Sequence, residues 1–121
     1  MKLTNGDLFG SREAFQKLIE RDDIPVRYAF EIVKLVKKLA PDFAAVEEQR
    51  NGLIRKYGTN KDGQIQVEQA GENFAKFVVD FNELMKIETE VIFEKVGVPD
   101  NIKILGQDLA ALEPFIELVT L

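Results

Sequence analysis

The longest stretch of the chain with a single hydrophobic periodicity runs from Ile24 to Tyr57. Apolar residues recur along it mostly at intervals of three and four, which places them on one stripe of an α-helix. The members of this first stripe are Ile32, Leu35, Leu39, Phe43, Val46, Leu53 and Tyr57. Gly58 is a suitable C-cap, and Pro25 suits a first turn behind Asp22 or Asp23 as cap. The pattern predicts a helix of about 50 Å, which projects from a domain of this size as an arm.

Pro41 is the residue of this stretch that most disfavours a continuous helix. Its ring removes a backbone donor and pushes Ala40 away from helical angles. The first stripe nevertheless passes through Pro41 without losing phase. We therefore expect one kinked helix. The alternative is a break, with Pro41 and Asp42 beginning a new helix.

The first half of the long helix carries a second apolar stripe, so two partners are needed there. Its members are Val26, Ala29, Phe30, Val33, Val36 and Ala40. Two alternatives could cover this face: the predicted N-terminal helix together with the helix that contains Phe74, or a second copy of the chain.

Three further helices are predicted. Residues 3–20 form the first, with Thr4, Asn5 and Asp7 as competing caps and a possible later start at Ser11. A clear amphipathic pattern begins at Gly71 or Asn73 and ends at Met85, and it predicts the second leg of a helical hairpin with the long helix. Residues 107–118 form a short last helix that Pro114 divides.

Short alternating segments predict a small antiparallel sheet at the open end of this hairpin. Asp62-Gly63 is a tight-turn dipeptide, and residues 64–67 follow it as a half-buried strand. Residues 88–96 form the strand that pairs with it, residues 97–100 form a turn, and residues 102–105 form a third strand. The predicted fold is α+β and mainly helical, in a single domain that spans residues 1–121.

Composition excludes several kinds of chemistry. The chain has no histidine and no cysteine, so neither a serine–histidine nor a cysteine–histidine hydrolase nor a thiolate zinc site is available. Residues 58–69 resemble a calcium loop at Asn60, Asp62 and Gly63, but Gly58 and Gln69 stand where the acidic first and last ligands belong. No phosphate-binding glycine motif occurs. We expect a protein that is not an enzyme and has no cofactor and no metal.

Charge is distributed unevenly along the chain. Residues 1–61 hold 12 Lys and Arg against 9 Asp and Glu, for a net charge of +3, and residues 62–121 hold 4 against 12, for −8. The basic residues of the first half alternate with carboxylates, so no nucleic-acid footprint is predicted. The acidic half is either a solvated surface or a mimic of nucleic acid toward a DNA-binding enzyme. No apolar run is long enough for a membrane span, and the N-terminus has no hydrophobic signal core, so we expect a cytosolic protein.

Two places are candidate partner-binding sites. Arg50 lies on the first stripe between Val46 and Leu53, where an apolar residue is expected. It either pairs internally, with Glu47 or with an acid of the Phe74 helix, or anchors a partner. The C-terminal residues Leu118, Val119 and Leu121 are apolar for a chain end, so they either dock on the domain or offer an anchor to a partner.

The order of these features resembles a family of small uncharacterised proteins encoded by tailed phages and prophages, chiefly of Gram-positive hosts. The resemblance covers essentially the whole chain. Its segments are LTNGDLF, REAFQKLIE, EEQRNGLIRKYG, KDG, ENFAKF, FNELMKIETEV and DLAALEPFI. Pro41 departs from the family pattern, in which the central helix continues through that position.

The resemblance implies a viral gene product in the host cytoplasm or the virion, and it supplies no catalytic residues. Together with the predicted arm, it favours a non-enzymatic protein that binds another protein, as a phage structural or assembly accessory. The alternative is an inhibitor of a host or defence enzyme that acts through the acidic C-terminal half. Binding by the inhibitor should weaken as salt rises, whereas apolar helix packing should not.

Overall fold

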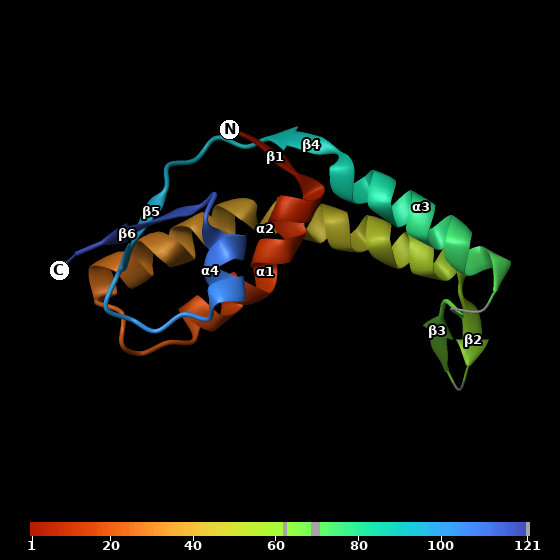
Figure 1. Ribbon diagram of the computed structural model, residues 1–121, viewed down its shortest axis with the longest axis horizontal. Helices are drawn as coiled ribbons and strands as arrows, with labels where there is room; N and C mark the ends of the chain where they lie inside the picture. The colour runs from red at the N-terminus through yellow and green to blue at the C-terminus, as the bar shows by residue number, and fades with distance from the viewer. Residues whose placement is uncertain (62, 69–70, 121) are drawn as a thin grey trace.

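A computed structural model describes residues 1–61, 63–68 and 71–120 of the chain, and it confirms the mainly helical α+β fold. Figure 1 shows a body that contains both chain ends and an arm that leaves it. The helices are α1 (Asn5–Ile19), α2 (Val26–Tyr57), α3 (Glu72–Lys86) and α4 (Gly106–Leu112). The strands are β1 (Lys2–Thr4), β2 (Thr59–Lys61), β3 (Gln64–Gln66), β4 (Glu88–Glu90), β5 (Val96–Pro99) and β6 (Ile116–Val119).

The long helix α2 is continuous through Pro41, which confirms the expectation of one helix. Pro41 and Lys37 are both exposed, so water can bond the Lys37 carbonyl oxygen that the proline leaves without a helical donor. The first stripe is buried from Ile32 to Val46 and half-buried at Leu53 and Tyr57. The stripe therefore packs fully against the body and less completely along the arm.

The expected N-cap of α2, Asp22 or Asp23, is wrong, whereas Gly58 is its C-cap as expected. Its N-cap is Pro25, and no side chain bonds the first turn. Asp23 instead accepts two hydrogen bonds from the Arg21 guanidinium, at 2.8 and 2.6 Å. These bonds lower the pKa of Asp23 and raise that of Arg21. Arg21 also donates to the Lys103 carbonyl oxygen, so it fastens the turn between α1 and α2 to the loop before α4.

The first helix begins at its earliest candidate cap. Thr4 accepts a hydrogen bond from the Asp7 backbone, and the Asp7 side chain accepts one from the Thr4 backbone, which is a complete capping box. Gly10 lies inside α1 and does not end it. Ser11 is buried and donates to the Leu8 carbonyl oxygen, so it is a helix-interior residue and not a cap.

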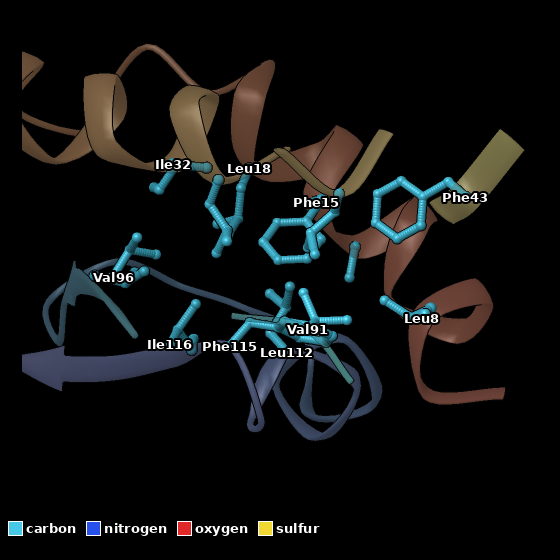
Figure 2. Close-up of a cluster of buried hydrophobic side chains, with 14 of the residues drawn as sticks. Leu8, Phe15, Leu18, Ile32, Phe43, Val91, Val96, Leu112, Phe115 and Ile116 are labelled. Atoms are coloured by element: carbon cyan, nitrogen blue, oxygen red, sulfur yellow. The ribbon is translucent and has the colours of Figure 1, made fainter. Parts of the chain in front are cut away.

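The core of the body lies where α1 crosses α2 and where α4 and β5 cover the two helices. Phe15 of α1 occupies its centre (Figure 2). Its ring centroid is 5.3 Å from that of Phe115, in an edge-on arrangement, and 6.4 Å from that of Phe43. Phe93 stacks on Phe115 at 5.5 Å. Four aromatic rings thus join α1, α2 and the C-terminal segments into one core.

The strands form three separate two-stranded sheets, whereas one small antiparallel sheet was expected. Residues 64–66 pair antiparallel with β2 and not with residues 88–96. Within that second segment, residues 88–90 are a strand that pairs antiparallel with β1 at the N-terminus, and the last residue, Val96, begins β5. The expected strand at 102–105 is turn and irregular structure in the described chain.

The third sheet is a parallel pair of β5 and β6, formed by residues that were expected to be a turn and the end of a helix. The last helix stops at Leu112, and Pro114 lies just beyond it, where its missing backbone donor and the clash of its ring with the preceding turn oppose continuation. Phe115 and Ile116 are buried, and extended backbone from Ile116 brings β6 alongside β5.

Replacing Phe15 by Ala tests this account of the core. The ring is 1% exposed, so its removal leaves a cavity between α1, α2 and Phe115. We expect Phe15→Ala to lower the free energy of unfolding by about 3–5 kcal/mol in urea denaturation. Val79→Ala is the control: Val79 is 65% exposed on α3, and its truncation should cost within about 0.5 kcal/mol. Equal losses for the two variants would contradict the assigned core.

Candidate functional site

The arm consists of the second half of α2, which leaves the body, and of α3, which returns antiparallel to it (Figure 1). The hairpin of β2 and β3 lies at its far end. The hairpin that pairs α2 with the Phe74 helix was predicted from sequence and is present. The arm is two helices thick, so each helix has one neighbour along most of its length.

Incomplete burial is the arm's main feature. Helix α3 has no buried residue, although six apolar residues share one face of it. All six are half-buried, as are three apolar residues of α2 that face them. We call this set the arm seam: Leu53, Ile54, Tyr57, Phe74, Phe77, Val78, Phe81, Leu84 and Met85. A stripe of this width normally faces a core on more than one side, and a two-helix hairpin covers one side.

Polar contacts fix the geometry of the arm at its base and along its length. At the base, Asn5 donates from its side chain to the Leu84 carbonyl oxygen at 3.0 Å and from its backbone to the Ile87 carbonyl oxygen at 2.8 Å. Further out, the Tyr57 hydroxyl donates to the Asp80 carboxylate at 2.5 Å. Phe77 and Phe81 stack with ring centroids 5.7 Å apart. The arm therefore has a defined shape although its seam is only half covered.

Gly58 joins the arm to its terminal hairpin. It caps α2 as predicted, but with an extended backbone, φ −86° and ψ 164°. Glycine is required there by close approach, because a Cβ atom would lie 2.4 Å from the Ile54 carbonyl oxygen and 2.6 Å from Ile65 Cγ2. The turn of the hairpin places Gly63 at φ +83°. The predicted partner of Gly63 in this turn, Asp62, lies outside the described residues, as does Gln69.

The expected internal ion pair of Arg50 is not found within the described chain. Glu47 instead forms an ion pair with Arg12 of α1, with 2.9 Å between the charged atoms. Arg50 is half-buried, and its guanidinium carbon lies 5.5 Å from the ring centroid of Phe9. The guanidinium carbon of Arg12 lies 4.9 Å from the same ring centroid. The aromatic face of Phe9 therefore replaces a carboxylate as the partner of Arg50, which a sequence pattern of charges does not reveal.

The C-terminal candidates lie at a separate site, beside β5. Leu118 and Val119 belong to β6, so this segment docks on the domain through its pairing with β5. Leu118 is nevertheless 53% exposed. Leu121 lies outside the described residues. The candidates from sequence thus form two groups, Glu47 and Arg50 beside α1 and the C-terminal pair beside β5, and no described contact joins them.

The second stripe of α2 gives a further surface, which was not among the candidate sites from sequence. Of the two covers left open for it, α1 with α3 or a second copy of the chain, the first is incomplete, because α3 packs on the other half of α2. Val26 is 83% exposed and Phe30 is 61% exposed, while Ala29, Val33 and Val36 are half-buried. The signal was present as an apolar face too wide for one partner. What the sequence could not show is that the partners present would cover this stripe only in part, at Ala29, Val33 and Val36.

The described chain contains no group of three or more His, Cys, Asp or Glu residues placed to hold a metal ion. Among its helices, none is both long and apolar enough to cross a membrane. A surface groove of about 440 Å³ lies between the first half of α2 and residues 92–96. Charged side chains that line it are Glu31, Lys34, Lys38 and Glu94. The geometry offers surfaces for macromolecules more clearly than a small-molecule site.

The half-covered seam predicts unequal protection along the chain. Amides of α3 should exchange with solvent faster than those of α1. The reason is that opening the arm exposes less buried apolar surface to water than opening the body. Native-state hydrogen exchange measured residue by residue tests this, with the buried turns of α1 around Phe15 as the internal reference. Equal opening free energies for α1 and α3 would show that the arm is as well buried as the body.

Comparison of the chain with protein-family models, with curated proteins and with solved structures gave no match. The functional conclusion therefore depends on the geometry of the arm and of the surfaces around α2.

Proposed function

We propose that this chain is a non-enzymatic protein that binds another protein through the arm seam, as a structural or assembly accessory of a tailed phage. One observation carries the proposal: α3 has an amphipathic stripe of six apolar residues and not one buried residue. An apolar face that is left half-covered on a preformed, hydrogen-bonded arm is the kind of surface that a partner helix can complete.

The arm supports this role physically in two ways. Its base is fixed by Asn5 and its length by the Tyr57–Asp80 hydrogen bond, so binding a partner requires little ordering of the arm itself. The seam is rich in phenylalanine, and buried aromatic residues contribute much of the energy of protein interfaces. A third helix laid along the seam would bury Phe74, Phe77 and Phe81 more fully, and such apolar packing is insensitive to salt.

The phage context of the proposal comes from the sequence resemblance, and so does the host cytoplasm or virion as its location. The alternative, an enzyme inhibitor that acts through the acidic half, has less support from the geometry. The acidic residues of that half are distributed over α3, β4, α4 and β6. Some are already engaged: Asp80 bonds Tyr57, Asp108 pairs with Lys17, and Glu90 pairs with the N-terminal ammonium group.

Site-specific photocrosslinking in phage-infected cells tests the proposal. A photoreactive amino acid replaces Val78, which is half-buried on the arm seam, or Glu83, which is exposed on α3 about 140° around the helix from Val78. We expect the Val78 position to crosslink to a virion or assembly protein, and to do so equally in low and high salt. The Glu83 position is the control and should give little product.

Three outcomes would contradict the proposal. Crosslinking at Val78 to a second copy of this chain alone would make the seam a self-association surface. Equal crosslinking at both positions would show that the seam has no special role. Capture of a host enzyme that is lost as salt rises would favour the inhibitor.

A further inference from the structure

We propose that copies of this chain associate head to tail, with the exposed face of α2 from one copy seated in the groove between α4 and β6 of the next. The first surface is the basic ridge, defined as Val26, Phe30, Lys34 and Lys37. The second is the acidic groove, defined as Gly106, Leu109, Ala110, Glu113, Ile116 and Leu118. This inference concerns surfaces outside the arm seam and does not depend on the proposed function.

The basic ridge combines an exposed aromatic residue with unpaired cations. Phe30 lies on the side of α2 opposite the buried first stripe, and the Lys34 ammonium group approaches its ring to 5.5 Å. Residues 26–40 contain four cations, Arg27, Lys34, Lys37 and Lys38, against the single carboxylate of Glu31. None of these four cations has a carboxylate partner in the described part of the chain. An apolar anchor with a basic border fits an apolar groove with an acidic border.

The acidic groove has that character. It is about 370 Å³ in volume, and its walls are mostly apolar, with Leu109 and Ala110 of α4 on one side and Leu118 of β6 on the other. Residues 105–120 contain three carboxylates and no cation. Asp108 already pairs with Lys17, and among the described residues Glu113, which lines the groove, and Glu117 have no ion pair. The groove therefore offers an apolar binding surface with negative charge beside it.

The fold prevents a copy from filling its own groove. Tyr28 of α2 packs against Gly97 of β5, with ring carbons 3.2 and 3.3 Å from the position of a Gly97 Cβ, so this side of α2 faces the β5–β6 sheet. Phe30 is two residues further along the helix, a rotation of about 200°, and points away from that sheet. The ridge and the groove thus lie on opposite sides of the body, and joining two copies leaves one of each surface free.

A contact between unlike surfaces is heterologous, so it generates a ring or an open filament. The symmetric alternative, in which two ridges meet, would bring Lys34 and Lys37 of both copies together at the cost of like-charge repulsion. Charge therefore favours the head-to-tail arrangement over a symmetric dimer.

Sedimentation velocity of the full chain, over a range of protein concentrations, tests the inference with two blocked variants. Phe30→Gln removes the anchor of the ridge, and Ala110→Arg places a cation in the groove; both positions are exposed, and circular dichroism checks that each variant is folded. Val79→Gln on α3 is the matched control, since Val79 is 65% exposed and lies outside both surfaces.

We expect wild type and Val79→Gln to assemble beyond the dimer as concentration rises. Each blocked variant alone should associate at least about tenfold more weakly. An equimolar mixture of the two should form a one-to-one heterodimer and grow no further, because it contains one intact ridge and one intact groove. Association should also weaken between about 0.01 M and 1 M salt, as the screening length falls from about 30 Å to about 3 Å.

Four results would overturn the inference. They are a wild-type chain that stays monomeric at every concentration, a closed dimer that neither substitution disrupts, a mixture of blocked variants that forms no heterodimer, and association that is unchanged by salt.

Discussion

The length of α2 constrains everything else in the structure. Its 32 residues extend about 48 Å, whereas a small domain is about 30 Å across, so one core cannot cover the whole helix. The first stripe from Ile32 to Val46 is buried against α1, β5 and the C-terminal segments. The remaining apolar residues of α2 lie beyond the body, where α3 covers them only in part. The arm and its open seam are consequences of this mismatch.

Side-chain burial accordingly decreases from the body to the tip of the arm. At one end Phe15, Phe43, Phe93 and Phe115 form a close-packed aromatic core. Along the arm, Phe77 and Phe81 stack on each other but stay half-buried, and at the tip β2 and β3 form an isolated hairpin. A two-stranded hairpin and a two-helix arm each contribute little stability alone. The body therefore supports the fold, and the arm is available for contact with another molecule.

Sequence periodicity predicted the helices well because the information is local. The stripe through Pro41 kept its phase, and the water-exposed position of the proline let the helix continue. Strand pairing was predicted poorly, because each strand has only three or four residues and its partner is chosen by the fold. Residues 3 and 4 of β1, which pair with β4, were assigned to the first helix. Residues 97–99 were expected to be a turn, but they belong to β5, which pairs with β6 where Val98 and Ile116 are buried.

The candidate surfaces were predicted in outline. An excess of apolar positions on α2 indicated an uncovered face, but which stripe stays open depends on where α3 packs, and that is a property of the whole fold. Arg50 was expected to pair with a carboxylate, but its guanidinium group lies over the ring of Phe9. The pairing of Glu47 with Arg12 joins residues that are distant in sequence, so local charge spacing could not indicate it.

The central claim is that α2 is one continuous helix whose second half leaves the body. A distance between spin labels at its two ends tests this most directly, and the absence of native cysteine allows labels at chosen sites. Arg27→Cys and Arg55→Cys place both labels on exposed positions of α2, and dilution with unlabelled protein removes distances between copies. Pulsed electron paramagnetic resonance should give a narrow distribution near about 42 Å, the rise of 28 helical residues. A broad distribution, or one centred well below that distance, would show that the helix breaks at Pro41 and that the arm does not project.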